Sequence, residues 1–362
     1  MLSYAIKLIG RSRSATIYFV GAKLLKAWSP FLTFLTALPA VSGPSSGLAL
    51  AATAESYKVS ANQLQDTSRE ASTGEQTDAL LQRAREFLQK GLLKDADRTV
   101  REYLDKHPNS ADGHFLLGYI LFKEQKAEAS LAEYTEGAKY HDPVPSDLKI
   151  VGLDYVLLND YLDADRWLTR SVEGDPNDSE SWYYLGRTKY NENRFEEAIH
   201  AFQECLKLDS RNVKAGANLG LALEGLGRIN EAKTAYRNAI AQQRNGSPKN
   251  AEPFIDLGNL LLEQNQIENA IAQLSEAREI SPQESRARTS LGKAYLRLNK
   301  LEEAQQELEK AVSLDPNSAG AHYLLGQVYR KKGWIEQAKA QLDRAAALNE
   351  QKPPAARHDS SP

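Results

Sequence analysis

The chain has 362 residues, of which 26% are charged and 41% hydrophobic, and this composition is typical of a soluble globular or repeat protein. Residues 1–54 contain five basic residues and no acidic one, and the rest of the chain holds 40 basic and 48 acidic residues. A body with this acidic balance is not a general nucleic-acid binder, because phosphate contacts need an excess of Lys and Arg on one face. Cys205 is the single cysteine, which excludes an intramolecular disulfide.

The first 54 residues have the pattern of an export signal. A basic stretch ends at Lys26, an apolar run extends from Ala27 to Val41, and small residues at 49–51 or 52–54 offer a cleavage site. Prolines interrupt the apolar run, which is also short for a membrane-spanning helix. We predict a signal peptide, and therefore an exported protein of the periplasm or cell envelope. The alternatives are an uncleaved signal anchor, which would hold the protein at a membrane, and a mitochondrial transit peptide.

Two further segments lack the apolar periodicity of a folded element. Residues 55–76 are polar, and we predict a flexible linker there. Residues 353–362 begin with two consecutive prolines, and we predict a disordered tail.

Between these segments a Leu-Gly step recurs along the chain. Its glycines are Gly118, Gly186, Gly220, Gly258, Gly292 and Gly326, with Val151-Gly152 in the remaining gap. Successive glycines lie 34 residues apart, except for an interval of 38 between Gly220 and Gly258. Glycine inside a helix costs about 0.5–1 kcal/mol relative to alanine, so its regular return indicates a structural requirement. A fixed period of this size indicates a repeat protein.

Alignment on the glycines divides the chain into eight units, each with two helical patterns. The units are 77–110, 111–144, 145–178, 179–212, 213–250, 251–284, 285–318 and 319–352. A proline closes many units, often as Asp-Pro-Asn, which we expect to stop one helix and cap the next.

A small residue stands at one constant place on the second helix of every unit. These residues are Ala96, Ser130, Ala164, Ala198, Ala232, Ala270, Ala304 and Ala338. We expect the glycine of the first helix and this small residue to mark where paired helices approach most closely.

The pattern resembles the tetratricopeptide repeat family over residues 77–352. The resemblance rests on the Leu-Gly step, the small residue of the second helix, the closing proline, and the aromatic or leucine after the small residue, as at Tyr134, Phe202 and Tyr236. The first unit departs from it, with Arg83-Ala84 in place of Leu-Gly. The resemblance implies an all-α, right-handed superhelical solenoid of antiparallel helix pairs. It also implies a non-catalytic scaffold or adaptor that binds a peptide segment or partner helix in the concave groove of its first helices.

The resemblance places particular side chains in that groove. The predicted groove residues are Phe115, Tyr119, Phe122, Lys149, Tyr183, Arg187, Tyr190, Lys293 and Arg297. Tyr183 and Tyr190 are seven residues apart and share one helix face, whereas we expect Tyr184 to pack towards neighbouring helices. The basic late section favours an acidic stretch on the partner. The alternative is that the aromatic residues only pack between first helices and that the charged residues form a solvated face.

The other classes of function have less support in the sequence. The histidines are scattered, and no metal-protease, paired-cysteine or phosphate-loop motif is present. We therefore predict no catalytic residue, metal or cofactor, with His114 and His322 as packed side chains and Cys205 as an inert core thiol. The expected partners are proteins or peptides, with no nucleic acid, and with a membrane only through an uncleaved N-terminal segment. The oligomeric state stays open, and the alternative function is a structural subunit of a cell-envelope assembly held by broad solenoid surfaces.

Overall fold

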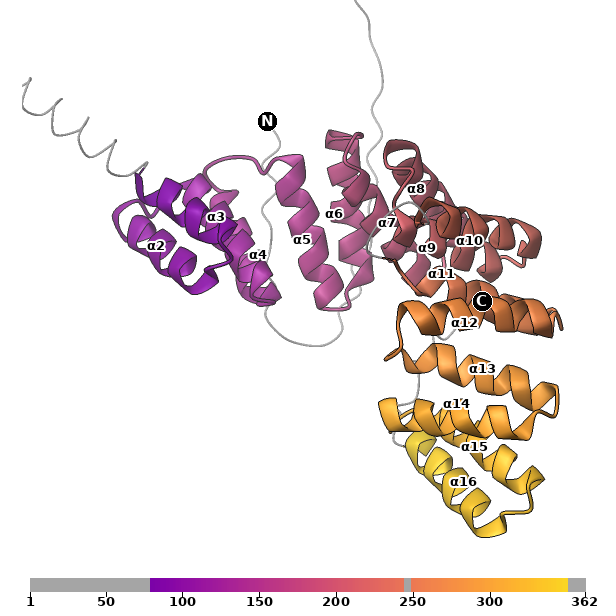
Figure 1. Ribbon diagram of the computed structural model, residues 1–362. Helices are drawn as coiled ribbons and strands as arrows, with labels where there is room; N and C mark the ends of the chain where they lie inside the picture. Colours follow the sequence, from indigo (N-terminus) through magenta and orange to yellow (C-terminus); the bar gives the residue numbers. More distant parts are fainter. Residues whose placement is uncertain (1–78, 244–248, 351–362) are drawn as a thin grey trace, which may run out of the picture. The chain divides into compact units, whose positions relative to one another are not determined.

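The computed structural model describes residues 79–243 and 249–350, and this part of the chain contains helices and no strand (Figure 1). The predicted export signal at 1–54, the predicted linker at 55–76 and the predicted tail at 353–362 lie outside the described residues. Among the described helices, none has the length and apolar character needed to cross a bilayer.

By its internal contacts the chain forms two compact units, Met1–Gly113 and His114–Pro362. In the first, residues 79–89 are helical and precede α2 (Leu93–Lys106) and the start of α3 (Ala111–Lys123). Its helices bury small and aliphatic side chains, among them Ala84 and Val100. The hydroxyl of Tyr103 donates to Oγ of Ser110 at 3.0 Å, at the turn that leads into α3.

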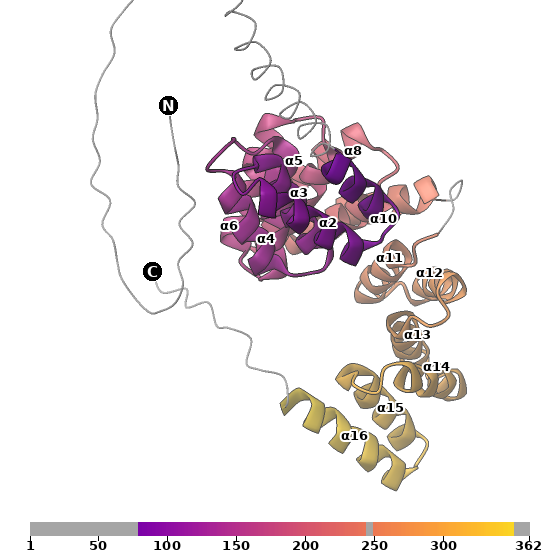
Figure 2. The same cartoon turned by 90° about the vertical axis from the view of Figure 1, so that its left-hand side faces the viewer.

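The second compact unit is a succession of helix pairs, which can be followed in both views (Figures 1 and 2). Odd-numbered helices are the first helices of their repeats and even-numbered helices the second. After α3 come α4 (Ala127–Gly137), α5 (Pro145–Leu157), α6 (Tyr161–Gly174), α7 (Ser179–Asn191), α8 (Phe195–Leu208), α9 (Val213–Gly225), α10 (Ile229–Gln243), α11 (Glu252–Glu263), α12 (Ile267–Ile280), α13 (Ser285–Arg297), α14 (Leu301–Leu314), α15 (Ala319–Lys331) and α16 (Ile335–Glu350). From α5 onwards each first helix contacts its own second helix and also the first helix of the next repeat. The predicted all-α repeat fold is confirmed.

The recurring glycines allow the helices of a pair to pack closely. A Cβ atom added to Gly186 would lie 2.6 Å from the ring of Phe202, and one added to Gly152 would lie 2.7 Å from Leu168. The small residue Ala198, four positions before Phe202, is fully buried. The close approach is therefore as predicted, and the side chain that covers each glycine is the aromatic or leucine that follows the small residue.

The turn inside each repeat holds one residue in the left-handed backbone region. These residues are Gly91, Gln125, Asn159, Asn193, Gly227, Asn265, Asn299 and Gly333, and they follow the period of the repeat. At Asn193 the turn closes with two backbone hydrogen bonds of 2.9 Å, from the amide of Asn193 to the carbonyl of Tyr190 and from the amide of Arg194 to the carbonyl of Lys189. Glycine and asparagine tolerate this conformation best, which explains why they occupy the place in seven of the eight turns.

The Asp-Pro-Asn junctions perform only part of the predicted role. The helix before the junction ends as expected. Here α6 ends at Gly174, and the side chain of Asp175 accepts a hydrogen bond from the backbone amide of Asn177 at 3.1 Å. The cap of α7 is the next residue, Asp178, which accepts from the amide of Glu180 at 3.0 Å. The expectation that the tripeptide itself caps the following helix is wrong, because its asparagine lies one position too early.

Candidate functional site

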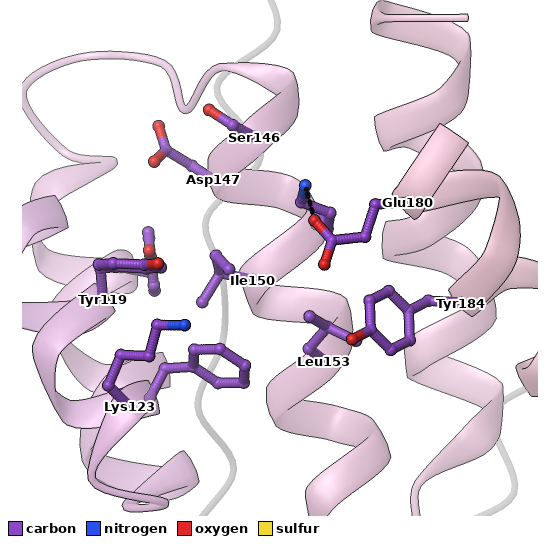
Figure 3. A pocket seen from close by; sticks show the side chains of 11 residues that line it. Tyr119, Lys123, Ser146, Asp147, Ile150, Leu153, Glu180 and Tyr184 are labelled. Carbon is purple, nitrogen blue, oxygen red and sulfur yellow. Dashed lines mark hydrogen bonds and ion pairs between the residues drawn. The ribbon is translucent and has the colours of Figure 1, made fainter. Parts of the chain in front are cut away.

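A pocket of about 470 Å³ opens between the first helices α3, α5 and α7. Side chains from all three helices point into it, with Tyr119 and Lys123 from α3, Leu153 from α5, and Glu180 and Tyr184 from α7 (Figure 3). Phe122, Tyr134, Ser146, Asp147, Lys149 and Ile150 complete the lining. Its lining is thus mixed, with aromatic and aliphatic side chains beside two lysines and two carboxylates.

Helical spacing and the repeat period place these side chains together. Tyr119 and Phe122 are three residues apart on α3, and Ile150 and Leu153 are three apart on α5, so each pair shares a helix face. Ile150 and Tyr184 are 34 residues apart and occupy the same position in consecutive repeats. Consecutive first helices therefore present matching positions to the same space.

Lys149 is committed to contacts within the protein. Its Nζ lies 2.9 Å from Oδ2 of Asp178 and 2.8 Å from Oε2 of Glu180. Partial burial alone would lower the pKa of Lys149, but the hydrogen bonds to Glu180 and Asp178 outweigh this effect and raise the pKa above its usual value. We conclude that this ammonium group joins α5 to the start of α7 and has little charge left for a ligand.

Lys123, in contrast, keeps its ammonium group available at the edge of the pocket. Its Nζ lies 5.2 Å from the ring centre of Tyr119 and 5.9 Å from that of Phe122, within the range of cation–π attraction. Within the described residues it forms no ion pair, and its side chain is exposed. An anionic or carbonyl group that enters the pocket can therefore reach an unneutralised cation.

The predicted groove residues divide between this pocket and other surroundings. Tyr119, Phe122 and Lys149 line it, as do Lys123, Ile150 and Tyr184, which the sequence-based prediction missed. Phe115 lies outside the lining and stacks on Tyr134, with ring centres 5.8 Å apart.

The predicted groove residues of α7 lie outside the pocket lining. Tyr183 is half-buried and contacts Phe202, with ring centres 6.3 Å apart, and its hydroxyl accepts from the Asn218 amide at 3.4 Å. Tyr190 packs edge-on against Phe195 at 5.5 Å. Arg187 is exposed, with its guanidinium 5.9 Å from the ring of Tyr183. Burial raises the pKa of both Tyr183 and Tyr190 above the usual value.

Tyr184 packs against neighbouring helices, as expected, and in addition lines the pocket, which was not expected. The buried cluster beside which it packs consists of Leu168, Val172, Leu185 and Ala201. The signal in the sequence was its equivalence to Ile150, because both stand two positions before the repeat glycine.

Lys293 and Arg297 lie on α13, and neither lines this pocket. Arg297 is exposed and donates a hydrogen bond from its guanidinium to the carbonyl of Leu262, at the end of α11. Lys293 is half-buried, and no carboxylate of the described residues pairs with either side chain.

The two buried histidines and the cysteine occupy structural positions. His114 is buried with Nδ1 2.7 Å from Oε2 of Glu133, and His322 is buried with Nδ1 2.6 Å from Oε1 of Gln341, so both are packed as predicted. Cys205 is fully buried, and burial raises its pKa to about 11, which disfavours the reactive thiolate. Within residues 79–243 and 249–350, no group of three or more His, Cys, Asp or Glu side chains has a geometry suited to a metal ion.

Family models agree with the repeat architecture. Models described as tetratricopeptide repeat match residues 81–145, 179–212, 225–294, 261–311 and 319–352, and a model described as TPR repeat matches residues 292–333. Together the matches span more than half of the chain. The chain belongs to the tetratricopeptide repeat family.

Two curated tetratricopeptide relatives match short parts of the chain. The PEX5-related protein of Homo sapiens is 33% identical over 76 residues, which are 21% of this chain and 12% of the relative. The peroxisomal targeting signal receptor of Kluyveromyces lactis is 35% identical over 71 residues, which are 20% of this chain and 12% of the relative. The chain thus spans about an eighth of each relative's length.

Solved structures share the tetratricopeptide fold over a larger part of the chain. A tetratricopeptide repeat protein from Parabacteroides merdae has a TM-score of 0.55 at 18% identity, over 70% of this chain and 98% of its own. The Cut9–Hcn1 hetero-tetramer of the APC/C gives a TM-score of 0.53 at 19% identity, over 72% of this chain and 50% of the other. These likenesses concern the fold alone. The tetratricopeptide family and fold support a role as a protein-interaction scaffold, a class that is generally non-catalytic.

Proposed function

We propose that the protein binds an extended segment of a partner protein along its first helices and anchors an apolar side chain of that segment in the pocket between α3, α5 and α7. The observation that carries the proposal is the lining of this pocket, in which aromatic and aliphatic side chains lie beside the ammonium of Lys123, which pairs with no carboxylate of the described residues. The protein would act as a non-catalytic scaffold or adaptor.

The chemistry of the pocket matches an apolar side chain with a polar neighbour. Full burial of one Leu or Phe side chain contributes about 1.5–3 kcal/mol, which gives only weak affinity by itself. The rings of Tyr119 and Tyr184 offer a large contact area with few rotatable bonds, so binding costs them little conformational entropy. Lys123 is placed to donate to a carboxylate or main-chain carbonyl beside the anchoring side chain, which adds orientation as well as affinity.

The test compares two matched double variants in affinity capture from the native host, followed by mass spectrometry. The pocket variant is Tyr119→Ala with Lys123→Glu. The control is Tyr183→Ala with Arg187→Glu, because these residues form the same tyrosine–cation pair outside the pocket lining. Thermal melts of both variants identify any loss of fold.

Each outcome of this comparison decides between the alternatives. A partner lost only with the pocket variant supports the proposed anchor, and its binding segment can then be mapped with peptides. A partner lost equally with both variants extends the site to Tyr183 and Arg187, as the sequence predicted. A partner retained by both refutes groove recognition.

The second candidate function is a structural subunit held by broad surfaces. It is favoured by the exposure of Trp334 (40%), at a turn position where most of the repeats have a polar residue, and of Ile335 (62%), the apolar first residue of α16. Retention of the partner by both groove variants, with loss in a Trp334→Ala, Ile335→Ser variant, would establish this alternative.

Export belongs to the same proposal. The basic and apolar pattern of residues 1–54 supports a signal peptide or signal anchor and a place in the periplasm or cell envelope, with mitochondrial import as the alternative. The mature N-terminus of protein purified from the native host tests this directly. A new terminus near residue 52 or 55 supports export with cleavage, whereas an intact terminus refutes cleavage. The linker at 55–76 and the limits of the eight units remain predictions of the same kind.

A further inference from the structure

Two neighbouring first helices, α13 and α15, carry six basic residues and no acidic one. The preceding first helix, α11, has the opposite composition, with Glu252, Asp256 and Glu263 and no basic residue. Because α13 contacts both α11 and α15, the sign of the charge reverses between adjacent first helices.

Two of the six basic residues are neutralised within the protein. Arg288 lies 2.9 Å from Oε2 of Glu307, and Arg286 lies 3.1 Å from Oε1 of Glu284. The other four, Lys293, Arg297, Arg330 and Lys331, form no ion pair with any carboxylate of the described residues. We call these four residues the α13–α15 basic face.

The contacts of this face bring its two helices together. Lys293 and Arg297 are four residues apart on α13, and Lys331 holds the position on α15 that Arg297 holds on α13. The Nζ of Lys331 donates to Oδ1 of Asn299 at 3.3 Å, in the turn that directly follows Arg297. This hydrogen bond, like that of Arg297 to the carbonyl of Leu262, is to a neutral oxygen atom and leaves the positive charge of the side chain uncompensated.

The helix termini explain part of this composition, because cations near a helix C-terminus interact favourably with the helix dipole. Arg297, Arg330 and Lys331 lie in the last turns of their helices. That explanation does not extend to Lys293, which lies in the middle of α13. It also does not explain why the equivalent position to Arg297 and Lys331 on α11 is Glu263. The helix dipole therefore explains only part of the positive charge of this face.

We infer that the α13–α15 basic face binds an acidic segment of a partner protein. The inference rests on the proposed function, because both place a protein segment on the first helices, and it adds the chemistry of that segment. Four cations within one surface favour several carboxylates in an extended stretch over a single anion. A nucleic-acid ligand is disfavoured, because the chain beyond residue 54 holds 40 basic and 48 acidic residues, whereas general binding to a phosphate backbone needs an excess of Lys and Arg.

The proposal is tested with a labelled peptide of alternating Glu and Ala, twelve residues long, and its Gln-Ala counterpart, in fluorescence anisotropy at two salt concentrations. The basic-face variant changes Lys293, Arg297, Arg330 and Lys331 to Gln. The control variant makes the same change at Lys233, Arg237, Lys310 and Lys339, which lie on second helices. Both variants lose four positive charges, so a general charge effect is common to them.

We expect the Glu-Ala peptide to bind more tightly than the Gln-Ala peptide, with an affinity that falls as salt rises. We expect the basic-face variant to bind it at least about ten-fold more weakly and the control variant to stay within about two-fold of wild type. Equal binding of the two peptides, or equal weakening in both variants, would overturn the inference. A basic-face variant that melts at a lower temperature yet binds like wild type would assign the four cations to helix stability alone.

Two further measurements distinguish a protein ligand from a nucleic-acid ligand, and the basic-face proposal from the pocket proposal. A single-stranded oligouridine that binds more tightly than the Glu-Ala peptide, with loss in the basic-face variant, would refute the choice of a protein ligand. The pocket variant at Tyr119 and Lys123 should bind the Glu-Ala peptide like wild type. Failure of the pocket thus appears in the capture experiment, and failure of the basic face appears in the peptide titration.

Discussion

Asp154 is a carboxyl group buried in α5, and it should make the stability of the protein depend on pH. It is fully buried, and neither of its oxygens has a hydrogen-bond partner among residues 79–243 and 249–350. Burial raises its pKa from 3.8 to about 7, and the nearby hydroxyl of Ser130, which opposes this shift only in part, donates to the carbonyl of Gly118 at 2.9 Å. Ile120, Ala222 and Val328 stand at the same position in other repeats. We therefore choose the substitution Asp154→Val.

The sign of the effect follows from the raised pKa. The folded protein holds a proton on Asp154 at pH values where the unfolded chain has released it, so the contribution to stability is greatest below pH 4 and is lost as the pH rises through 7. One pKa unit corresponds to about 1.36 kcal/mol, which gives a penalty of about 1 kcal/mol at pH 4.5 and about 4 kcal/mol at pH 8. The advantage of Asp154→Val over wild type should widen by about 3 kcal/mol between these pH values.

Urea unfolding at pH 4.5, 6 and 8, followed by circular dichroism, measures this difference. Thr188→Val is the matched control, because Thr188 holds the same position in the next repeat and its buried hydroxyl also has no partner in the described part of the chain. Its effect on the free energy of unfolding should be the same at each pH, because a hydroxyl does not titrate in this range. An Asp154→Val advantage that is equally independent of pH, or a loss of stability at pH 8, would refute the reasoning.

Four further substitutions test the packing, a turn and a buried ion pair by thermal and urea unfolding. Gly186→Ala should lower the free energy of unfolding by about 1–3 kcal/mol, because the added carbon would lie 2.6 Å from an aromatic ring. Gly320→Ala should raise the free energy of unfolding by about 0.4–1 kcal/mol, because the added carbon would meet no neighbouring atom within 4 Å. An equal loss at both sites would contradict the close-packing argument. Gln125→Gly should stabilise the protein by about 0.5–1 kcal/mol, because glutamine adopts a left-handed backbone there at φ 60°, and no gain would show that the turn imposes no strain. Asp165→Asn should cost about 2–3 kcal/mol, because it weakens an ion pair of 2.7 Å with the buried Lys189, and a cost below about 1 kcal/mol would show that this pair is effectively exposed.

The repeat architecture was predictable because its determinants are periodic in the sequence. One glycine and one small residue per unit specify how closely each helix pair packs, and the same period places Tyr119, Phe122 and Lys149 around one pocket. The asparagine or glycine found in seven of the eight turns was also present in the sequence as a periodic signal, although its left-handed backbone was not anticipated.

The environments of individual side chains were less predictable, because contacts between repeats decide them. Tyr183 and Tyr184 are adjacent in sequence, yet Tyr184 lines the pocket and Tyr183 packs on Phe202. Lys149 looked available for a ligand until its two carboxylate partners, 29 and 31 residues away, were located. Neither separation matches the repeat period, so no periodic pattern in the sequence points to such pairs.

The repeats provide internal controls for separating structural from functional side chains. A requirement of the fold acts on every unit alike, as the glycines and the turn residues show, so it cannot explain a difference between units at matching exposed positions. Lys123 stands where the next two repeats have Leu157 and Asn191, and Arg297 stands where the preceding repeat has Glu263. At these positions the fold accepts a cation, an anion, an amide or an aliphatic chain. The fold therefore does not determine which side chain stands at these positions, and a binding role can. For this reason we expect a partner to bind at the pocket edge and at the α13–α15 basic face.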